Sequence, residues 1–139
     1  MIDELRARMT AFLAVYRVGV LSTASAEGAW AMPVHYRLVP DDDLAVECLL
    51  PAWADVSYFL ERDPRALFII QIPSAGEGGD GLRWLQILGT ASIIARPAWD
   101  SFLPAPPLEG QYRVIRLAPR RIDLFDEGRG WGARETLDL

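Results

Sequence analysis

Short apolar segments, each followed by a turn signal, recur along most of this sequence. They are rich in β-branched and aromatic residues and span residues 18–24, 29–39, 44–50, 66–72, 82–95, 111–117 and 120–125. Turns at residues 25–28 and 40–43 join the first three segments, which is typical of an antiparallel meander. The pattern therefore predicts a mainly β fold, a small closed or half-open antiparallel barrel of about six to seven strands with flanking helices.

Two stretches change to the periodicity of a helix. In residues 1–16 apolar side chains recur at every third or fourth position, which predicts an N-terminal helix. Residues 51–62 repeat this pattern, and Pro64 limits that helix because a residue before proline disfavours helical backbone. The glycine-rich residues 74–81 predict a plain hairpin loop, and residues 99–103 predict one short helical turn.

The longest strand candidate, residues 82–95, has two different faces. Successive strand residues point to opposite faces, so one face carries the apolar or small residues Leu85, Ile87, Gly89, Ala91 and Ile93, which we expect in the core. The other face mixes types and carries Trp84, Gln86, Leu88, Thr90 and Ser92. Such a mixed face suits a surface that meets a ligand or a second subunit.

Length and charge limit the classes of protein. The 139 residues contain no long linker, so we expect one domain over residues 1–139, with a helix at 1–16, the barrel at 17–126 and a tail at 127–139. A net charge of −5 argues against a nucleic-acid partner, which requires clustered positive charge. No apolar run is long enough to cross a membrane and the acidic N-terminus does not resemble a signal peptide, so we expect a cytoplasmic protein.

Few residues could carry chemistry directly. The chain has one histidine, one cysteine and no lysine, and it lacks the motifs of nucleophilic or zinc enzymes. For His35, a structural role is favoured over a catalytic one. Cys48 is interpreted as a core residue. The acids 41–43 are interpreted as a solvated turn, so no metal site is expected. Four arginines at 113, 116, 120 and 121 are interpreted as solvated charges at a strand edge. No catalytic residue is assigned, and a cofactor would have to carry any reaction.

Several local strings, in order, resemble the pyridoxamine 5'-phosphate oxidase-like family of FMN-binding split barrels. They are Gly19-Val20-Leu21-Ser22-Thr23, Met32-Pro33-Val34-His35-Tyr36, Arg62-Asp63-Pro64-Arg65-Ala66, Trp84-Leu85-Gln86-Ile87-Leu88-Gly89-Thr90-Ala91, and residues 112–122 around Pro119. The resemblance covers roughly residues 10–126. It implies an antiparallel split β-barrel that forms a homodimer, with FMN and a small-molecule ligand in the cleft between subunits.

By the same resemblance, particular residues would border the FMN. Gln86 would approach the flavin and Trp84 lies beside it; the surroundings of Leu49 and Leu50 would line the ring or the ribityl chain. His35 and Arg37 would border the same cleft, and Trp131 and Arg134 would close it from the partner subunit. The family implies a flavin-dependent oxidoreductase acting on a small molecule, whose identity the sequence does not disclose.

One position departs from the family pattern. Many members carry an Arg/Lys pair that grips the flavin phosphate, and Ala54 and Asp55 stand in its place here. Arg17, Arg37 or Arg83 could supply charge from another direction. The alternative is a non-enzymatic dimeric barrel that binds a small ligand and has lost tight FMN binding. Haem or a deazaflavin is a further option in related barrels, with His35 as the available imidazole. Strict pyridoxamine phosphate oxidase activity is not expected, because no second basic cluster is evident for the substrate phosphate.

Overall fold

The structure is a computed structural model, and it describes residues 2–40, 42, 44–73, 81–102 and 110–139. In chain order its elements are α1 (Ile2–Val15), β1 (Val18–Thr23), β2 (Ala31–Leu38), β3 (Val46–Pro51), α2 (Asp55–Arg62), β4 (Arg65–Ile72), β5 (Arg83–Ile93), η1 (Trp99–Ser101), β6 (Tyr112–Asp126), η2 (Glu127–Arg129) and β7 (Arg134–Asp138). The predicted glycine-rich loop, most of the acidic turn and part of the predicted turn at 99–103 fall outside the described residues.

The strands form one closed antiparallel barrel. Their order is β3-β2-β1-β4-β5-β6, and β6 pairs back with β3 to close the ring. β7 is added on the far edge of β6 as an extra strand. The predicted antiparallel split-barrel class with flanking helices is therefore confirmed, including the β1–β2–β3 meander.

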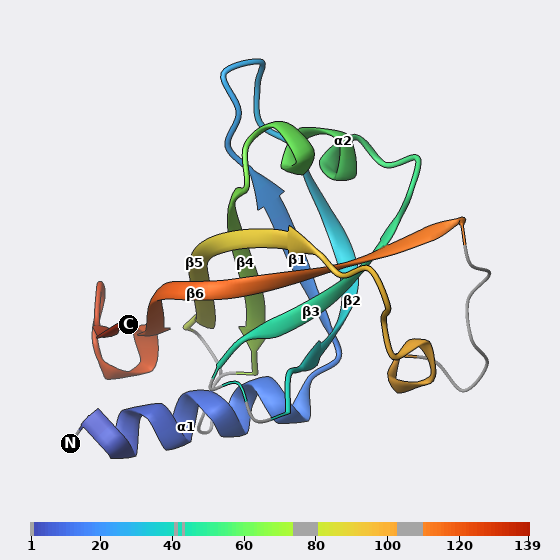
Figure 1. The fold of residues 1–139 in the computed structure, drawn as a ribbon. Helices are drawn as coiled ribbons and strands as arrows, with labels where there is room; N and C mark the ends of the chain where they lie inside the picture. Colours follow the sequence, from blue (N-terminus) through green and yellow to red (C-terminus); the bar gives the residue numbers. More distant parts are fainter. Residues whose placement is uncertain (1, 41, 43, 74–80, 103–109) are drawn as a thin grey trace.

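The two helices lie at opposite ends of the barrel (Figure 1). α1 buries Leu5, Met9 and Leu13, which recur every four residues and therefore share one helix face. The phenol of Tyr36 on β2 donates a buried hydrogen bond of 2.8 Å to the carbonyl oxygen of Leu13, which fixes the end of α1 against the barrel. α2 buries Val56, Phe59 and Leu60 in the same manner.

The core follows the alternation expected from the sequence along most of β5. Leu85, Ile87 and Ala91 are buried, whereas Leu88 on the other face is exposed. Ile93 was predicted to be in the core and is 50% exposed, so this prediction was wrong. It is the last residue of β5, so the alternation had reached the rim of the barrel.

The C-terminal third differs from the expectation in two ways. Residues 111–117 and 120–125 were predicted as separate strands, but β6 runs through Pro119 without a break. A β-bulge makes this possible: Leu88 pairs with Arg121 and Gly89 with Pro119, which leaves Arg120 without an opposite residue. The predicted tail contains β7, which pairs with β6 from Arg121 to Phe125.

Gly89 of β5 lies close against the backbone of this bulge. A Cβ atom at this position would lie 2.2 Å from the carbonyl oxygen of Ala118, a backbone atom with little freedom to move. We expect Gly89→Ala to lower the free energy of unfolding by about 1–3 kcal/mol, the usual cost of overpacking. Urea denaturation checks this, with Thr90→Ala on the exposed face of the same strand as the control. Equal stability of the two variants would contradict the expectation.

Candidate functional site

An aromatic surface lies on the outer face of the barrel, across β5, β6 and β7. The strand register places Trp84 beside Phe125, and Phe125 beside Arg134. The rings of Trp84 and Phe125 are stacked, with centroids 4.4 Å apart and planes 10° from parallel. The guanidinium of Arg134 lies 6.0 Å from the centroid of Phe125, at the outer limit of a cation–π contact. The surface thus presents two stacked, nearly parallel rings beside a positive charge.

The amide of Gln86 is fixed next to this surface. Its Oε1 accepts a hydrogen bond of 3.3 Å from the indole N–H of Trp84, and its Nε2 donates to Asp123 at 3.2 Å. These two bonds determine which end of the amide is the donor. One N–H and one lone pair of the amide remain for a ligand.

Asp123 anchors the network from β6. The carboxylate is 3% exposed and accepts a 2.6 Å hydrogen bond from the Thr136 hydroxyl and a 3.1 Å bond from Arg121. Burial acts to raise the pKa of Asp123, but the hydrogen bonds from Thr136, Arg121 and Gln86, together with the charge of Arg121, outweigh it and lower the pKa. The residue is therefore a charged acceptor at neutral pH.

The lowered pKa makes this contribution to stability dependent on pH. A carboxylate whose folded pKa lies below its unfolded value of about 3.9 stabilises the fold above that value and loses the effect as the pH falls through the folded pKa. We expect Asp123→Asn to cost about 1–3 kcal/mol at pH 7, because three hydrogen bonds to a charge are weakened. The gap between native protein and variant should narrow below about pH 4. Unfolding free energies measured over the acid range check this, and a gap that widens on acidification would contradict it.

A cavity of about 430 Å³ opens on this outer face, between β4 and β5. Ile69, Gln71, Arg83, Trp84 and Gln86 line it. Arg83 donates a 2.5 Å hydrogen bond to the carbonyl oxygen of Pro73, and its Nε–H is buried without a partner among the described residues. The volume is within the usual range of small-molecule sites. The cavity therefore combines an apolar wall, an oriented amide and a cation.

A second group of predicted site residues lies on β2 and β3. His35 is exposed and its side chain makes no hydrogen bond or ion pair with the described part of the chain, so the structural role expected for it is not seen. Arg37 pairs at 2.5 Å with Glu47, which is 2% exposed and also binds Arg116 at 2.8 Å. Leu49, beside His35 in the register, is buried.

The surroundings of Leu49 and Leu50 were predicted to line the flavin; the side chain of Leu50 itself belongs to the barrel core. Trp131, between η2 and β7, is 85% exposed. The structure thus brings Trp84, Gln86 and Arg134 together on one side of the molecule. His35, Arg37 and Leu49 form a separate group.

The two groups do not meet within one chain. β2 and β5 are separated in the barrel by β1 and β4, so their outer faces point in different directions. The arrangement of strands in Figure 1 shows this separation around the ring. A ligand that contacts both groups would therefore need surfaces from two copies of the chain.

The start of α2 offers little to an anionic group. Ala54 is the N-cap, is 5% exposed, and its side chain caps nothing; Asp55 adds a negative charge in the first turn. A phosphate at this helix end would meet the helix dipole but no cationic side chain from these positions. The residues present fit a flat ring on the β5–β7 side and do not fit an FMN phosphate at α2.

Sequence reasoning missed Phe125, Asp123 and Thr136 as parts of the site. The signal available was the alternation in residues 120–125, which places Asp123 and Phe125 on one face. Thr136 could not be found because the tail was not predicted as a strand.

Cys48 and the acidic residues can also be compared with the expectations from the sequence. Cys48 is fully buried, as predicted, and burial raises the pKa of its thiol. Within residues 2–40, 42, 44–73, 81–102 and 110–139, no cluster of three or more His, Cys, Asp or Glu side chains is placed to hold a metal ion. No helix in the same ranges has the length and apolar character needed to span a bilayer.

Three of the four arginines of β6 form ion pairs, although the sequence predicted solvated charges at a strand edge. Arg113 pairs with Glu61, Arg116 with Glu47 and Arg121 with Asp123. Arg113 and Arg121 do not share a face, because the bulge at Arg120 reverses the alternation between them.

No family model matches this chain, and no curated protein matches it in sequence. Solved structures do resemble it. A heme binding protein from Mycobacterium smegmatis superposes with a TM-score of 0.70 at 22% identity over 96% of this chain, which spans 56% of that protein. A candidate pyridoxamine 5'-phosphate oxidase from Listeria innocua gives 0.67 at 20% identity over 88% of this chain and 98% of its own. An FAD-binding protein from Mesorhizobium loti gives 0.63 at 16% identity over 84% and 90%. At these identities the likeness establishes the shared fold.

Proposed function

We propose that this protein binds a flavin-class cofactor between two copies of the chain and serves as a flavin-dependent oxidoreductase of the pyridoxamine-oxidase-like group. The observation that carries the proposal is the fixed amide of Gln86 beside the Trp84–Phe125 stack and a cavity of about 430 Å³. A flat ring system with carbonyl and N–H groups at its edge is complementary to such a surface.

A homodimer would complete this site. The outer faces of β1 and β4 lie between the two groups of site residues and carry Val18, Val20 and Ile69, of which Val18 is 53% and Val20 is 41% exposed. Exposed apolar side chains in register on one sheet face favour burial against another protein surface. In a two-fold dimer, His35 and Arg37 of one copy would approach Gln86 and Arg134 of the other.

The residues of the site would bind and position the flavin in this proposal. Electron transfer is chemistry that the flavin supplies when bound. Gln86, oriented by Asp123, would hold the ring edge, and Trp84 would exclude water from one side of it. Arg83, whose Nε–H has no hydrogen-bond partner among the described residues, would place positive charge near the cofactor in the absence of a basic pair at α2. No residue of the chain is assigned as an acid, base or nucleophile.

An absorbance spectrum of the freshly purified protein, followed by titration with FMN, tests the proposal. We expect flavin absorption, or saturable binding at micromolar FMN, that Gln86→Leu weakens about 10-fold or more while Thr90→Ala on the same strand leaves it unchanged. A colourless protein that fails to bind micromolar FMN would overturn the proposal.

The second candidate function is a non-enzymatic binding module with the same dimeric barrel. It is favoured by Ala54 and Asp55 at the start of α2, where a cationic grip on a flavin phosphate is missing. The module would bind a ring-shaped ligand in the β4–β5 cavity without catalysing its turnover. Tight FMN binding together with reduction of the bound flavin by NADH or NADPH would exclude this candidate.

The same spectrum separates haem and deazaflavin from FMN. His35 is the imidazole that a haem iron would use, since it is exposed and free of hydrogen bonds to the described residues. Added haemin would then give a Soret shift that His35→Ala abolishes. A shift that persists in His35→Ala would exclude this histidine as the ligand.

A further inference from the structure

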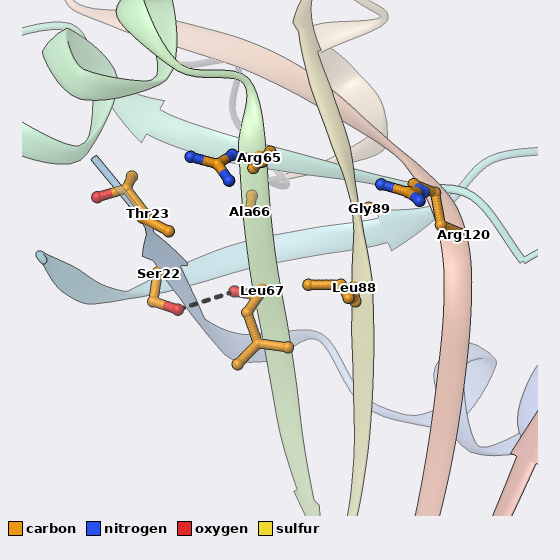
Figure 2. Close-up of a pocket in the computed structure, with 9 residues that line it drawn as sticks. Ser22, Thr23, Arg65, Ala66, Leu67, Leu88, Gly89 and Arg120 are labelled. Atoms are coloured by element: carbon orange, nitrogen blue, oxygen red, sulfur yellow. Dashed lines mark hydrogen bonds between the residues drawn. The ribbon is translucent and has the colours of Figure 1, made fainter. Parts of the chain in front are cut away.

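A second cavity, of about 470 Å³, lies on the outer face of the barrel away from Trp84 and Gln86. It is formed where the end of β1 and the start of β4 meet the middle of β5 and the bulge of β6. Figure 2 shows it from outside, with Arg65 and Arg120 on separate strands and Leu67 and Leu88 between and below them. None of its lining residues is an aspartate or a glutamate.

Arg120 owes its position to the β-bulge. In a regular strand it would face a residue of β5, but Pro119 pairs with Gly89 and Arg121 with Leu88, so Arg120 is the extra residue. Bulges commonly redirect a side chain beside a binding site. Whereas Arg113, Arg116 and Arg121 each pair with an acid, the exposed Arg120 side chain has no hydrogen bond or ion pair among the described residues.

Arg65 is held in one orientation by its neighbour. Its Nε and Nη2 donate to the carboxylate of Asp63 at 3.0 and 2.6 Å. The hydrogen bonds from Arg65 lower the pKa of Asp63 to about 2, so the pair stays charged throughout the neutral range. The Nη1 group is left for another acceptor. Arg65 is therefore paired with an acid, whereas the Arg120 side chain has no counter-ion among the described residues.

Between the arginines the surface is apolar. Leu67 is half-buried and Leu88 is 45% exposed, so both offer apolar surface to a ligand. The Ser22 hydroxyl donates a weak 3.3 Å hydrogen bond to the carbonyl oxygen of Leu67, drawn dashed in Figure 2, and its oxygen can still accept. The combination is an apolar floor with two guanidinium groups at its rim.

We propose that this cavity binds a small organic monocarboxylate, with the carboxylate on Arg120 and the apolar chain on Leu67 and Leu88. Guanidinium groups bind carboxylates through charged hydrogen bonds. An inorganic anion would leave the apolar floor exposed, and a neutral hydrocarbon would leave the arginines unused. The cavity lies on the same outer faces of β1 and β4 as the proposed dimer surface, but it shares no lining residue with the proposed flavin site.

Isothermal titration of the purified protein, as it assembles, with octanoate, octanol and acetate tests the proposal. Octanoate should bind more tightly than octanol, which lacks the charge, and than acetate, which lacks the chain. Arg120→Gln should weaken octanoate binding about 10-fold or more and leave octanol binding unchanged. Arg96→Gln removes the same charge from an exposed arginine outside the cavity and should have no effect.

Two further measurements test the apolar floor and separate this cavity from the flavin site. Leu88→Ser should weaken octanoate and octanol alike, because it removes the floor that both chains share. The FMN titration should be unchanged in Arg120→Gln, so failure of the carboxylate site and failure of the flavin site are distinguishable. Equal binding of octanoate and octanol, or equal octanoate binding by Arg120→Gln and Arg96→Gln, would overturn the proposal.

Discussion

Replacing Ala54 with arginine and Asp55 with lysine should raise the affinity for FMN by about 10²- to 10⁴-fold. Two charged hydrogen bonds to the phosphate are worth roughly 3–6 kcal/mol together. The change also removes the negative charge of Asp55 from the first turn of α2, where the helix dipole already favours an anion. Titration of flavin fluorescence, in the native protein and in the variant, gives both dissociation constants.

Positions 54 and 55 differ in how readily they can accommodate a long charged side chain. Asp55 is exposed, but Ala54 is 5% exposed, so an arginine there has to extend out of a buried position. Asp55→Lys alone is therefore the safer variant and should produce roughly half of the gain in free energy. Asp100→Lys makes the same change in charge at an exposed residue of η1 and should leave the affinity unaltered. If the native protein already binds FMN tightly and neither variant improves on it, the phosphate is held elsewhere.

Truncation of Phe68 to alanine should lower the free energy of unfolding by about 3–5 kcal/mol. Phe68, on β4, is fully buried and lies edge-on to Tyr36, with ring centroids 4.9 Å apart and planes at 68°. Tyr36 in turn holds the end of α1 through Leu13. Loss of the ring therefore leaves a cavity and frees the residue that ties α1 to the barrel. Denaturant unfolding measures the loss, with Phe125→Ala, a partly exposed aromatic, as the smaller comparison.

A double-mutant cycle with Gly19 makes this result specific to packing. A Cβ at Gly19 would lie 2.3 Å from Cζ of Phe68 and 2.8 Å from the carbonyl oxygen of Ile69. Gly19→Ala should therefore destabilise the native protein, and less so in Phe68→Leu, where the ring is gone and the clash with the carbonyl remains. Strictly additive losses would show that the ring does not occupy the space beside Gly19.

The strands could be predicted where each carries its own pattern. β1 to β5 are apolar segments bounded by turn residues, and the short connections between β1, β2 and β3 predict their antiparallel meander. The pairing of β4 with β1 joins strands that are distant in sequence and could not be predicted in this way. β7 has no such pattern, because Leu137 is its one buried residue and its position depends on pairing with β6. Pro119 predicted a break in β6, and the bulge that accommodates it arises from contact with Gly89, which is distant in sequence.

In the candidate site, too, the features that depend on contacts between distant parts of the sequence could not be predicted. That Trp84 and Gln86 share a face follows from strand alternation alone, and the structure places them together. That Asp123 fixes Gln86 depends on the register between β5 and β6, which a bulge shifts and the sequence does not reveal. Leu49 and Leu50 point to opposite faces, so side chains from both could not line one surface of the strand.

The bulge also divides β6 into two halves of opposite phase. Ile115 and Leu117 fill the core before it, and Ile122 and Leu124 fill the core after it. Because Arg120 is the one extra residue, its deletion would give a regular strand in which Ile122 and Leu124 still face the core. Insertion of a further residue would instead turn Ile122 and Leu124 outward and carry Arg121 and Asp123 into the barrel. Among divergent sequences of this fold, β6 should therefore tolerate the loss of the bulge residue far better than the gain of another one.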